Sequence, residues 1–397
     1  MGRVSEMSIR VLCVCDYFLP GFKAGGPIRT LKNMPALLSG AVTFSYLTRD
    51  RDLGSTEPYE KIAPDEWASY PHGRVFYATE ALFGTPALSK ALSTADTDIL
   101  YLNSFFSPRS SVAIVIRNWI RPFGKPILLA PRGEFSPGAL ALKGGKKRLY
   151  LALARAMGLY RNLWWHASTD SERQDILRVF PDAGLRIFTA EDPVDLSIDA
   201  TATYKKKVTG LVQLVFVSRI SPMKNLDGLL HILTGVTCQV SLHIHGPIED
   251  EPYWQRCQTL IRDLPSNVVV EYRGVLHPDD VSRVFSAGDL FVFPTHGENF
   301  GHVIFEAVRA GTPVVVSDQT PWQPDTTGAV TRLPLDAVDA WRAQIEMVAQ
   351  FTDTEQQARR ADTLLYARRH ATSEKTRQDN LRMFQEVVRR SEEKVNQ

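Results

Sequence analysis

Two carboxylates, Glu298 and Glu306, flank a glycine-containing loop in the segment FVFPTHGENFGHVIFEAVRAGTP. The apolar run 290–293 predicts a buried strand, and a helix is predicted over 302–310. Gly301 would let backbone N–H groups approach an anion, to which the helix N-terminus adds partial positive charge. Carboxylates repel phosphate but accept hydrogen bonds from sugar diols. The pattern therefore predicts a diphosphate between two sugar rings or, alternatively, an ordinary strand–helix connection with solvent-facing glutamates.

Two cations follow another apolar run, in FVSRISPMKNLDGLL. Arg219 comes directly after the predicted strand 211–217, and Lys224 lies five residues later at the start of a predicted helix. Such cations could neutralise a diphosphate leaving group without a metal, because charge-assisted hydrogen bonds contribute about 1.5–3 kcal/mol each. The alternative is a pair of solvated surface cations.

Two further segments follow predicted strands nearer the start of the chain. DYFLPGFKAGGPIRT contains Gly25 and Gly26 before a predicted helix, and it matches neither the dinucleotide nor the ATP glycine fingerprint. It is either a ligand loop or a flexible connection. LLAPRGEFSPGAL contains Arg132 and Glu134, which are candidates for acceptor recognition or for a structural ion pair.

Short apolar runs alternate with amphipathic stretches over most of the chain, which favours doubly wound parallel α/β sheets. Ligands of such sheets bind at the carboxyl ends of strands, where the four segments above all lie. The predicted strands are 9–15, 42–47, 75–77, 99–103, 127–130, 164–168, 211–217, 240–245, 268–272, 290–293 and 314–317. The predicted helices are 28–38, 146–157, 171–180, 226–233, 278–285, 302–310, 337–351, 354–370 and 373–394.

The strand pattern restarts near residue 205, after the polar stretch DPVDLSIDATATYKKK. We therefore predict an N-terminal domain over 1–200, a C-terminal domain over 201–375, and a final helix over 376–397 that could cross back to the first domain. Two domains agree with a length of 397 residues.

The composition is that of a globular protein, with 44% hydrophobic and 23% charged residues. A net charge of +2 gives no general attraction to nucleic acid. Four cysteines are too few for a disulfide framework, and we see neither a secretion signal nor an apolar run long enough to span a membrane. A cytoplasmic location is therefore expected.

Several other residue pairs resemble metal sites. Asp50 with Asp52 and Asp96 with Asp98 form D-x-D pairs, and His243 with His245 share one face of a predicted strand. None is accompanied in sequence by a full ligand set, so we predict no metal and no other cofactor.

One basic run has aromatic neighbours. It contains Lys143, Lys146, Lys147, Arg148, Arg155 and Arg161, followed by Trp164 and Trp165. It predicts either peripheral contact with an anionic membrane surface or a solvated helix beside two core tryptophans.

Six segments of the chain, taken in order, resemble glycosyltransferase family 4, among the group 1 glycosyl transferases. They are GGPIRTL, PRGEFSPGAL, HASTDSERQDI, FVSRISPMKN, PTHGENFGHVIFEAVRAGTPVV and SDQTPW. The resemblance spans residues 10–325, and its most specific element is the pair Glu298 and Glu306. It implies two facing Rossmann-like domains, the GT-B fold. It also implies retaining, metal-independent transfer from a nucleoside diphosphate sugar.

The resemblance also implies roles for single residues. Arg219 and Lys224 would clamp the diphosphate, Glu306 would bind the ribose, and Glu298 with the backbone of Asn299, Phe300 and Gly301 would contact the donor sugar. Gly274 and Val275 would border the nucleobase, and Gly25 and Gly26 would lie over the diphosphate.

These expectations combine into one function and two alternatives. The first is a hexosyltransferase that acts on a saccharide or lipid-linked acceptor in polysaccharide or glycolipid synthesis, in the cytoplasm or on the inner face of the cell membrane. The alternatives are a non-catalytic subunit that binds a nucleotide sugar and a nucleotide-sugar epimerase on a related fold. The sequence does not specify the sugar, nucleobase, acceptor, linkage or oligomeric state.

Overall fold

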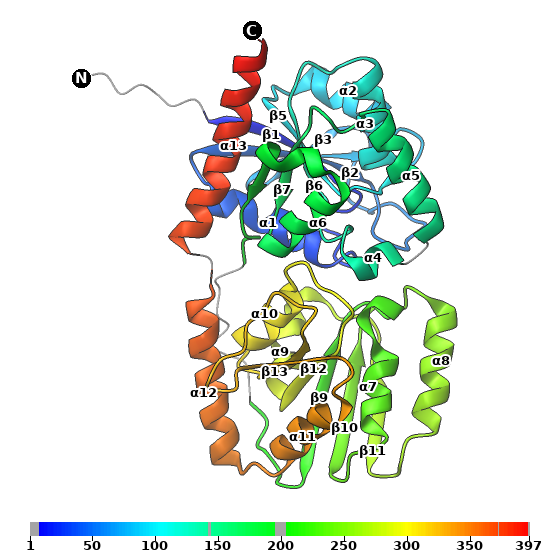
Figure 1. Cartoon of the computed structure of the whole chain (residues 1–397), viewed down its shortest axis with the longest axis vertical. Helices are drawn as coiled ribbons and strands as arrows, with labels where there is room; N and C mark the ends of the chain where they lie inside the picture. Colours follow the sequence, from blue (N-terminus) through cyan, green and yellow to red (C-terminus); the bar gives the residue numbers. More distant parts are fainter. Residues whose placement is uncertain (1–7, 142–143, 195–203, 372, 396–397) are drawn as a thin grey trace, which may run out of the picture. The chain divides into compact units, whose positions relative to one another are not determined.

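The computed structural model describes residues 8–141, 144–194, 204–371 and 373–395. Its contacts divide the chain into two compact units, Met1–Val194 with Thr372–Gln397 and Asp195–Ala371. Each unit is an α/β sandwich around one sheet, as the alternation of apolar runs predicts (Figure 1). Within the described ranges, no helix is both long and apolar enough to cross a bilayer.

The first unit contains an eight-stranded sheet with the order β3-β4-β2-β1-β5-β6-β7-β8. All neighbouring strands pair in parallel except β3 and β4, which are antiparallel. The strands are β1 (Ile9–Val14), β2 (Val42–Arg49), β3 (Trp67–Tyr70), β4 (Gly73–Ala78), β5 (Ile99–Asn103), β6 (Ile127–Ala130), β7 (Trp164–Ala167) and β8 (Ile187–Thr189).

Helices cover both faces of this sheet. One apolar core includes side chains of α2, α3, α5 and α6, and the opposite core includes those of α1 and α13. Figure 1 shows α13 on the side of the first unit opposite to α2, α3 and α5. The helices are α1 (Gly26–Leu37), α2 (Thr85–Thr94), α3 (Ala113–Ile120), α4 (Pro137–Ala141), α5 (Gly144–Ala156), α6 (Asp170–Val179) and α13 (Glu374–Val395).

The second unit contains a six-stranded parallel sheet with the order β11-β10-β9-β12-β13-β14. Its strands are β9 (Leu211–Val217), β10 (Gln239–His245), β11 (Val268–Tyr272), β12 (Leu290–Phe293), β13 (Val314–Ser317) and β14 (Val330–Leu333). Its helices are α7 (Leu226–Leu233), α8 (Glu251–Arg262), α9 (Val281–Ala287), α10 (His302–Arg309), α11 (Val338–Ala349) and α12 (Asp353–Arg369).

The division between the units falls six residues before the boundary predicted at 200, and α13 groups with the first unit. Most of the predicted connection lies in 195–203, outside the described residues, as does Lys143 of the basic run. Trp164 and Trp165 lie on β7 and are almost fully buried. Both rings therefore belong to the cores of the sheet, as the second interpretation of the basic run expects, and membrane contact by its helix stays a prediction.

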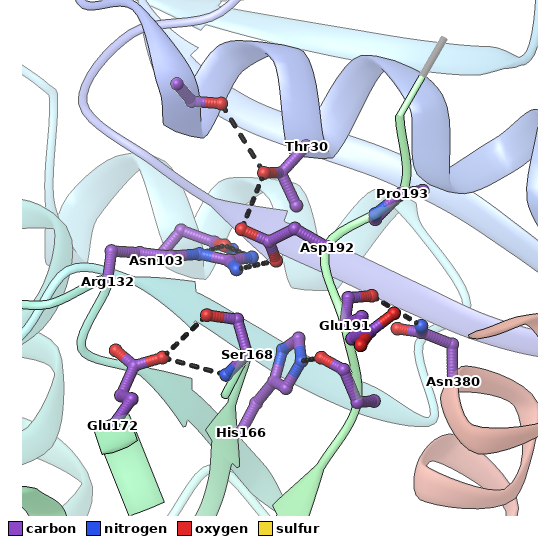
Figure 2. A network of polar contacts seen from close by, with 12 residues as sticks. Thr30, Asn103, Arg132, His166, Ser168, Glu172, Glu191, Asp192, Pro193 and Asn380 are labelled. Carbon is purple, nitrogen blue, oxygen red and sulfur yellow. Dashed lines mark hydrogen bonds and ion pairs between the residues drawn. The ribbon is translucent and has the colours of Figure 1, made fainter. Parts of the chain in front are cut away.

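A buried polar network fastens the carboxyl end of the first sheet to the point where the chain leaves the unit (Figure 2). The guanidinium of Arg132 pairs with Asp192 at 2.5 Å and donates to Asn103 Oδ1 at 2.8 Å. Asp192 also accepts from the Thr30 hydroxyl on α1 at 3.0 Å. Removing two charges from water is costly, and this arrangement offsets the cost by pairing and hydrogen-bonding both ions.

The same network fixes the tautomer of His166. Its Nε2 lies 2.8 Å from the Ala190 carbonyl, which can only accept, so Nε2 carries the proton. Its Nδ1 then accepts from the Tyr101 hydroxyl at 2.5 Å, and that hydroxyl in turn accepts from Arg132 at 2.8 Å. The hydrogen bonds thus run in one direction from Arg132 to the carbonyl of Ala190, which follows β8.

This histidine gives the first unit a predictable pH dependence. Burial and the nearby Arg132 charge lower the pKa of His166 to about 4, whereas an unfolded histidine titrates near about 6.5. At pH values between these two pKa values, the His166 imidazole is protonated in the unfolded chain but not in the folded one. The contribution of His166 to stability is therefore complete above about pH 6.5 and falls by up to about 3 kcal/mol as the pH drops toward 4.

We expect His166→Gln to reduce the slope of unfolding free energy against pH over this window, as measured by urea unfolding. The exposed histidine variant His296→Gln serves as the control and should keep the wild-type slope. An unchanged slope in His166→Gln would contradict the assignment.

Candidate functional site

Two neighbouring strands of the second sheet bring the predicted cations and carboxylates to one edge. β9 and β12 are hydrogen-bonded in parallel, so the loops that follow them leave the sheet side by side. The backbone of the first loop accepts twice from the second: the Met223 carbonyl receives the His296 N–H at 2.9 Å and the Thr295 hydroxyl at 3.0 Å. Two hydrogen bonds therefore join loops that are about 75 positions apart in sequence.

Lys224 and Glu298 form an ion pair at the centre of this edge. Lys224 Nζ lies 2.5 Å from Glu298 Oε1, and each side chain is only 13% exposed. The Lys224 ammonium also lies 5.9 Å from the centre of the Phe293 ring. The resemblance implies a diphosphate contact for the lysine and a sugar contact for the glutamate, and the structure pairs the two side chains with each other.

Arg219 is held in the same way by a residue that sequence reasoning missed. Its guanidinium lies 2.5 Å from Glu249 Oε1, with both side chains more than one-third exposed. Glu249 is on the loop after β10, which is joined to the Arg219 loop by a bridge between Ile220 and Ile248. Each of the two cations is therefore balanced by a carboxylate from a neighbouring loop.

Gly246, also missed, explains how these loops approach so closely. Its φ is 139°, and a Cβ built at this position would lie 1.8 Å from the Ser218 carbonyl oxygen. Any side chain there would push the loop of Arg219 away. The sequence signal was available, because HIHGP places this glycine directly after an apolar strand.

The loop before α10 is set by Gly301 and Trp322. Gly301 has φ 81°, and a Cβ there would lie 2.9 Å from the Ile304 side chain. The Trp322 indole N–H donates to the Phe300 carbonyl at 2.7 Å. Glu306 follows on the second turn of α10 and is half-buried. Lys224, Glu298 and the turn before α10 therefore belong to one connected edge of the second sheet.

Gly274 and Val275 lie on the loop after β11 at the same sheet edge. The Gly274 carbonyl accepts from the Gly246 N–H at 2.8 Å, which links this loop to that of Arg219 through the β10 loop. Gly274 has φ 76°, and Val275 is exposed. Asn299 and Phe300 are half-buried beside Glu298.

The remaining predicted residues belong to the first unit. Gly25, with φ 75°, precedes α1, which starts at Gly26.

Arg132 is buried in the network of Figure 2. Glu134 accepts from the Ser104 hydroxyl at 2.9 Å and from the Phe106 N–H at 3.0 Å, and burial raises the pKa of its carboxyl. Arg132 and Glu134 do not pair with each other, and an acceptor contact by either residue stays a prediction.

A second charged cluster of the first unit escaped sequence reasoning. Arg49, at the end of β2, pairs with Glu80 and lies 3.6 Å from Asp16, and Arg109 reaches the same Glu80 at 2.9 Å. These residues are up to 93 positions apart in sequence, so only the sheet order brings them together at the carboxyl ends of β1, β2 and β4. Glu80 and Arg109 are the exposed members.

The metal-like pairs have structural partners. Asp52 caps the N–H of Phe22 at 3.0 Å, and Asp98 binds the Arg10 guanidinium at 2.7 Å. Burial, together with the Arg273 charge, lowers the pKa of His245 to about 4. Among the residues that the structure describes, no group of three or more His, Cys, Asp or Glu side chains is arranged to hold a metal.

Two α/β units, each built around one largely parallel sheet, match the GT-B fold of solved structures. HepE from Anabaena, solved with UDP and glucose, superposes with a TM-score of 0.67 at 16% identity, over 95% of this chain and 99% of that one. Residues 202–362 match the model for glycosyl transferases group 1. The matched residues lie within the second unit.

The curated relatives match over shorter segments. The sulfoquinovosyl transferase SQD2 of Arabidopsis thaliana is 34% identical over 26% of this chain and 19% of its own length. A D-inositol 3-phosphate glycosyltransferase of Xylanimonas cellulosilytica is 30% identical over 38% of this chain and 39% of its own length. The matched segments thus span less than half of either relative.

The Lys224–Glu298 pair has a testable effect on stability. We expect Lys224→Met to lower the unfolding free energy by about 1–3 kcal/mol, because it leaves a mostly buried carboxylate without its cation. Adding Glu298→Gln should recover a large part of this loss, giving clear non-additivity in a double-mutant cycle measured by urea unfolding. The exposed pair Arg283 and Asp280 is the matched control and should show little coupling. Additive effects for Lys224 and Glu298 would contradict the structural pairing.

Proposed function

We propose that this protein is a retaining, metal-independent glycosyltransferase of the family 4 type. It would move a hexosyl unit from a nucleoside diphosphate sugar to a saccharide or lipid-linked acceptor, in the cytoplasm, during polysaccharide or glycolipid synthesis. The observation that carries the proposal is the joined edge of the second sheet, where Lys224, Glu298 and Arg219 converge. The names of the curated relatives, which describe glycosyl transfer, support the same reaction class.

The proposed reaction places new charge beside these cations. The bond between the anomeric carbon and the diphosphate oxygen breaks, and its electron pair leaves with the diphosphate. The acceptor hydroxyl oxygen bonds to that carbon on the same face, and its proton passes to an oxygen of the departing diphosphate. Arg219 and Lys224 would stabilise the departing anion, and removing one such donor typically costs 10²–10³-fold in rate.

The carboxylate partners would keep the cations in position before the donor binds. Glu249 and Glu298 hold Arg219 and Lys224 at 2.5 Å, so little side-chain ordering is left for the binding step. An entering diphosphate would compete with these carboxylates for the same N–H groups. Glu298, displaced from Lys224, would then be free to accept hydrogen bonds from the donor sugar.

The other assignments follow the resemblance. Glu306 would bind the ribose hydroxyls. The backbone of residues 299–301 would contact the donor sugar, and Gly274 and Val275 would border the nucleobase. Gly25 and Gly26 would contact the diphosphate from the first unit. For the acceptor, the exposed Glu80 and Arg109 are stronger candidates than Arg132 and Glu134, whose polar atoms are already engaged inside the unit.

Kinetics of single variants test the assignment. We expect Glu306→Ala to raise the donor KM strongly with a smaller effect on kcat, because a ribose contact is the same in ground and transition states. Lys224→Ala and Arg219→Ala should mainly lower kcat, by about 10²–10³-fold, because they meet charge that develops during bond cleavage. Arg283→Ala, an exposed cation of the same unit, is the control. Near-wild-type kinetics for all three site variants would reject the assignment.

The nature of the product separates transfer from its alternatives. After a mass-spectrometric screen of nucleotide sugars identifies the donor, we expect NMR of the product to show the anomeric configuration of the donor, with activity unaffected by EDTA. A ligand bound without turnover would indicate a non-catalytic subunit. A changed sugar without any acceptor would indicate an epimerase.

A further inference from the structure

Positive charge is concentrated in one part of the first unit. Residues 107–165 contain eleven of the 46 lysines and arginines and one acidic residue, Glu134, whose side chain points into the protein. The whole chain carries only +2, so the remainder is net negative. This segment includes α3 and α5, which join consecutive strands and contribute to the same apolar core.

Contacts between the two helical segments show that they are neighbours. The Lys147 ammonium of α5 lies 4.9 Å from the centre of the Phe106 ring, which lies seven residues before the start of α3. The Tyr150 ring of α5 lies 6.2 Å from the same Phe106 ring. Figure 1 shows both helices on the same side of the first unit. Both helices therefore cover the same side of the first unit, and their outer surfaces are together called here the α3–α5 face.

This face exposes apolar side chains at helical spacing. On α3 they are Ile116, Trp119 and Ile120, at positions i, i+3 and i+4. On α5 and just after it they are Leu149, Leu153 and Met157, at i, i+4 and i+8. Among the described residues these six are nearly half of the thirteen large apolar side chains that are exposed. Contiguous apolar exposure of this kind marks a surface that contacts a partner.

Exposed cations surround the apolar rows. Arg121 and Lys125 follow α3, Lys146 and Arg148 lie in the first turns of α5, and Arg155 lies near its end. Beyond α5, a pocket of about 450 Å³ is lined by Arg155, Arg161 and Arg186, with Asp182 as the opposing charge. Arg186 is already bound to Asp182 at 3.1 Å, which leaves Arg155 and Arg161 as the cations at the rim.

We propose that the α3–α5 face docks on an anionic lipid bilayer. Apolar rows flanked by Lys and Arg, with a tryptophan among them, match the interfacial zone of a membrane, where rings and alkyl chains enter and cations meet headgroup phosphates. Protein interfaces are instead depleted of lysine, and nucleic-acid surfaces do not use rows of leucine, isoleucine and methionine. This inference does not depend on glycosyl transfer, since an inactive protein can still bind vesicles.

Flotation of the full-length protein with vesicles tests the proposal. We expect binding to phosphatidylcholine vesicles that contain phosphatidylglycerol, weaker binding at high salt, and little binding to phosphatidylcholine alone. The double variant with Arg155→Gln and Arg161→Gln should have a vesicle–water partition coefficient about 25-fold lower, because each cation contributes roughly fivefold. Ile120→Ser with Leu149→Ser should lower it by at least about tenfold.

Matched controls use equally exposed residues elsewhere. Lys32→Gln with Lys61→Gln removes two exposed cations of the first unit, and Val269→Ser with Leu365→Ser removes two exposed apolar side chains of the second. Both controls should float like the wild type. The proposal is overturned if the protein stays unbound to anionic vesicles at low salt. It is also overturned if the Ile120 and Leu149 changes dissociate a dimer without altering vesicle binding.

Discussion

The parallel pairing of β9 with β12 is the constraint on which the candidate site depends. Because these strands are neighbours, the loops that leave their carboxyl ends are joined by two hydrogen bonds to the Met223 carbonyl. Only this pairing brings the Lys224 ammonium to within 2.5 Å of Glu298. A glycine at 246 extends the same edge to Arg219, because no side chain fits between it and Ser218.

Charge compensation is a common feature of both units. Arg132 with Asp192 in the first unit and Lys207 with Asp289 in the second are buried ion pairs that tie distant segments together. Such pairs add little net stability compared with apolar packing. Removing one partner, however, leaves the other charge buried without compensation and strongly destabilises the fold. At the sheet edge of the second unit the pairs are less buried, so an incoming anion could exchange for a carboxylate there at lower cost.

The two faces of the first sheet differ in what covers them. One face is closed by α1 and by α13, whose Met383, Phe384 and Val387 enter the core. The opposite face carries α3 and α5, which bury one side each and leave apolar rows on the other. Among the described residues, α3 and α5 therefore expose large apolar side chains, whereas α1 and α13 do not.

Much of the architecture was predictable because strands buried on both faces are apolar throughout. All eleven predicted strands are present, and the helices predicted at 226–233 and 302–310 appear as Leu226–Leu233 and His302–Arg309. The elements missed include some with weak local signals and some, such as α3 (Ala113–Ile120), whose apolar sequence does not distinguish a helix from a strand. Those with weak signals include the partly exposed edge strand β3 and the three-residue β8, and α8 was also missed, half of whose sequence EPYWQRCQTLIR is polar or charged.

The sequence by itself determined which residue types stand at strand ends, and therefore that Arg219, Lys224, Glu298 and Glu306 belong to one sheet edge. It could not determine their partners, because an ion pair depends on strand order and loop approach rather than on spacing along the chain. The structure alone decided that Lys224 meets Glu298, that Arg219 meets Glu249, and that Arg132 is paired with Asp192 rather than Glu134. The apolar and polar pattern along each segment follows from how that segment is buried, so it can be recognised in the sequence. Polar contacts between segments depend on which segments become neighbours when the sheet assembles.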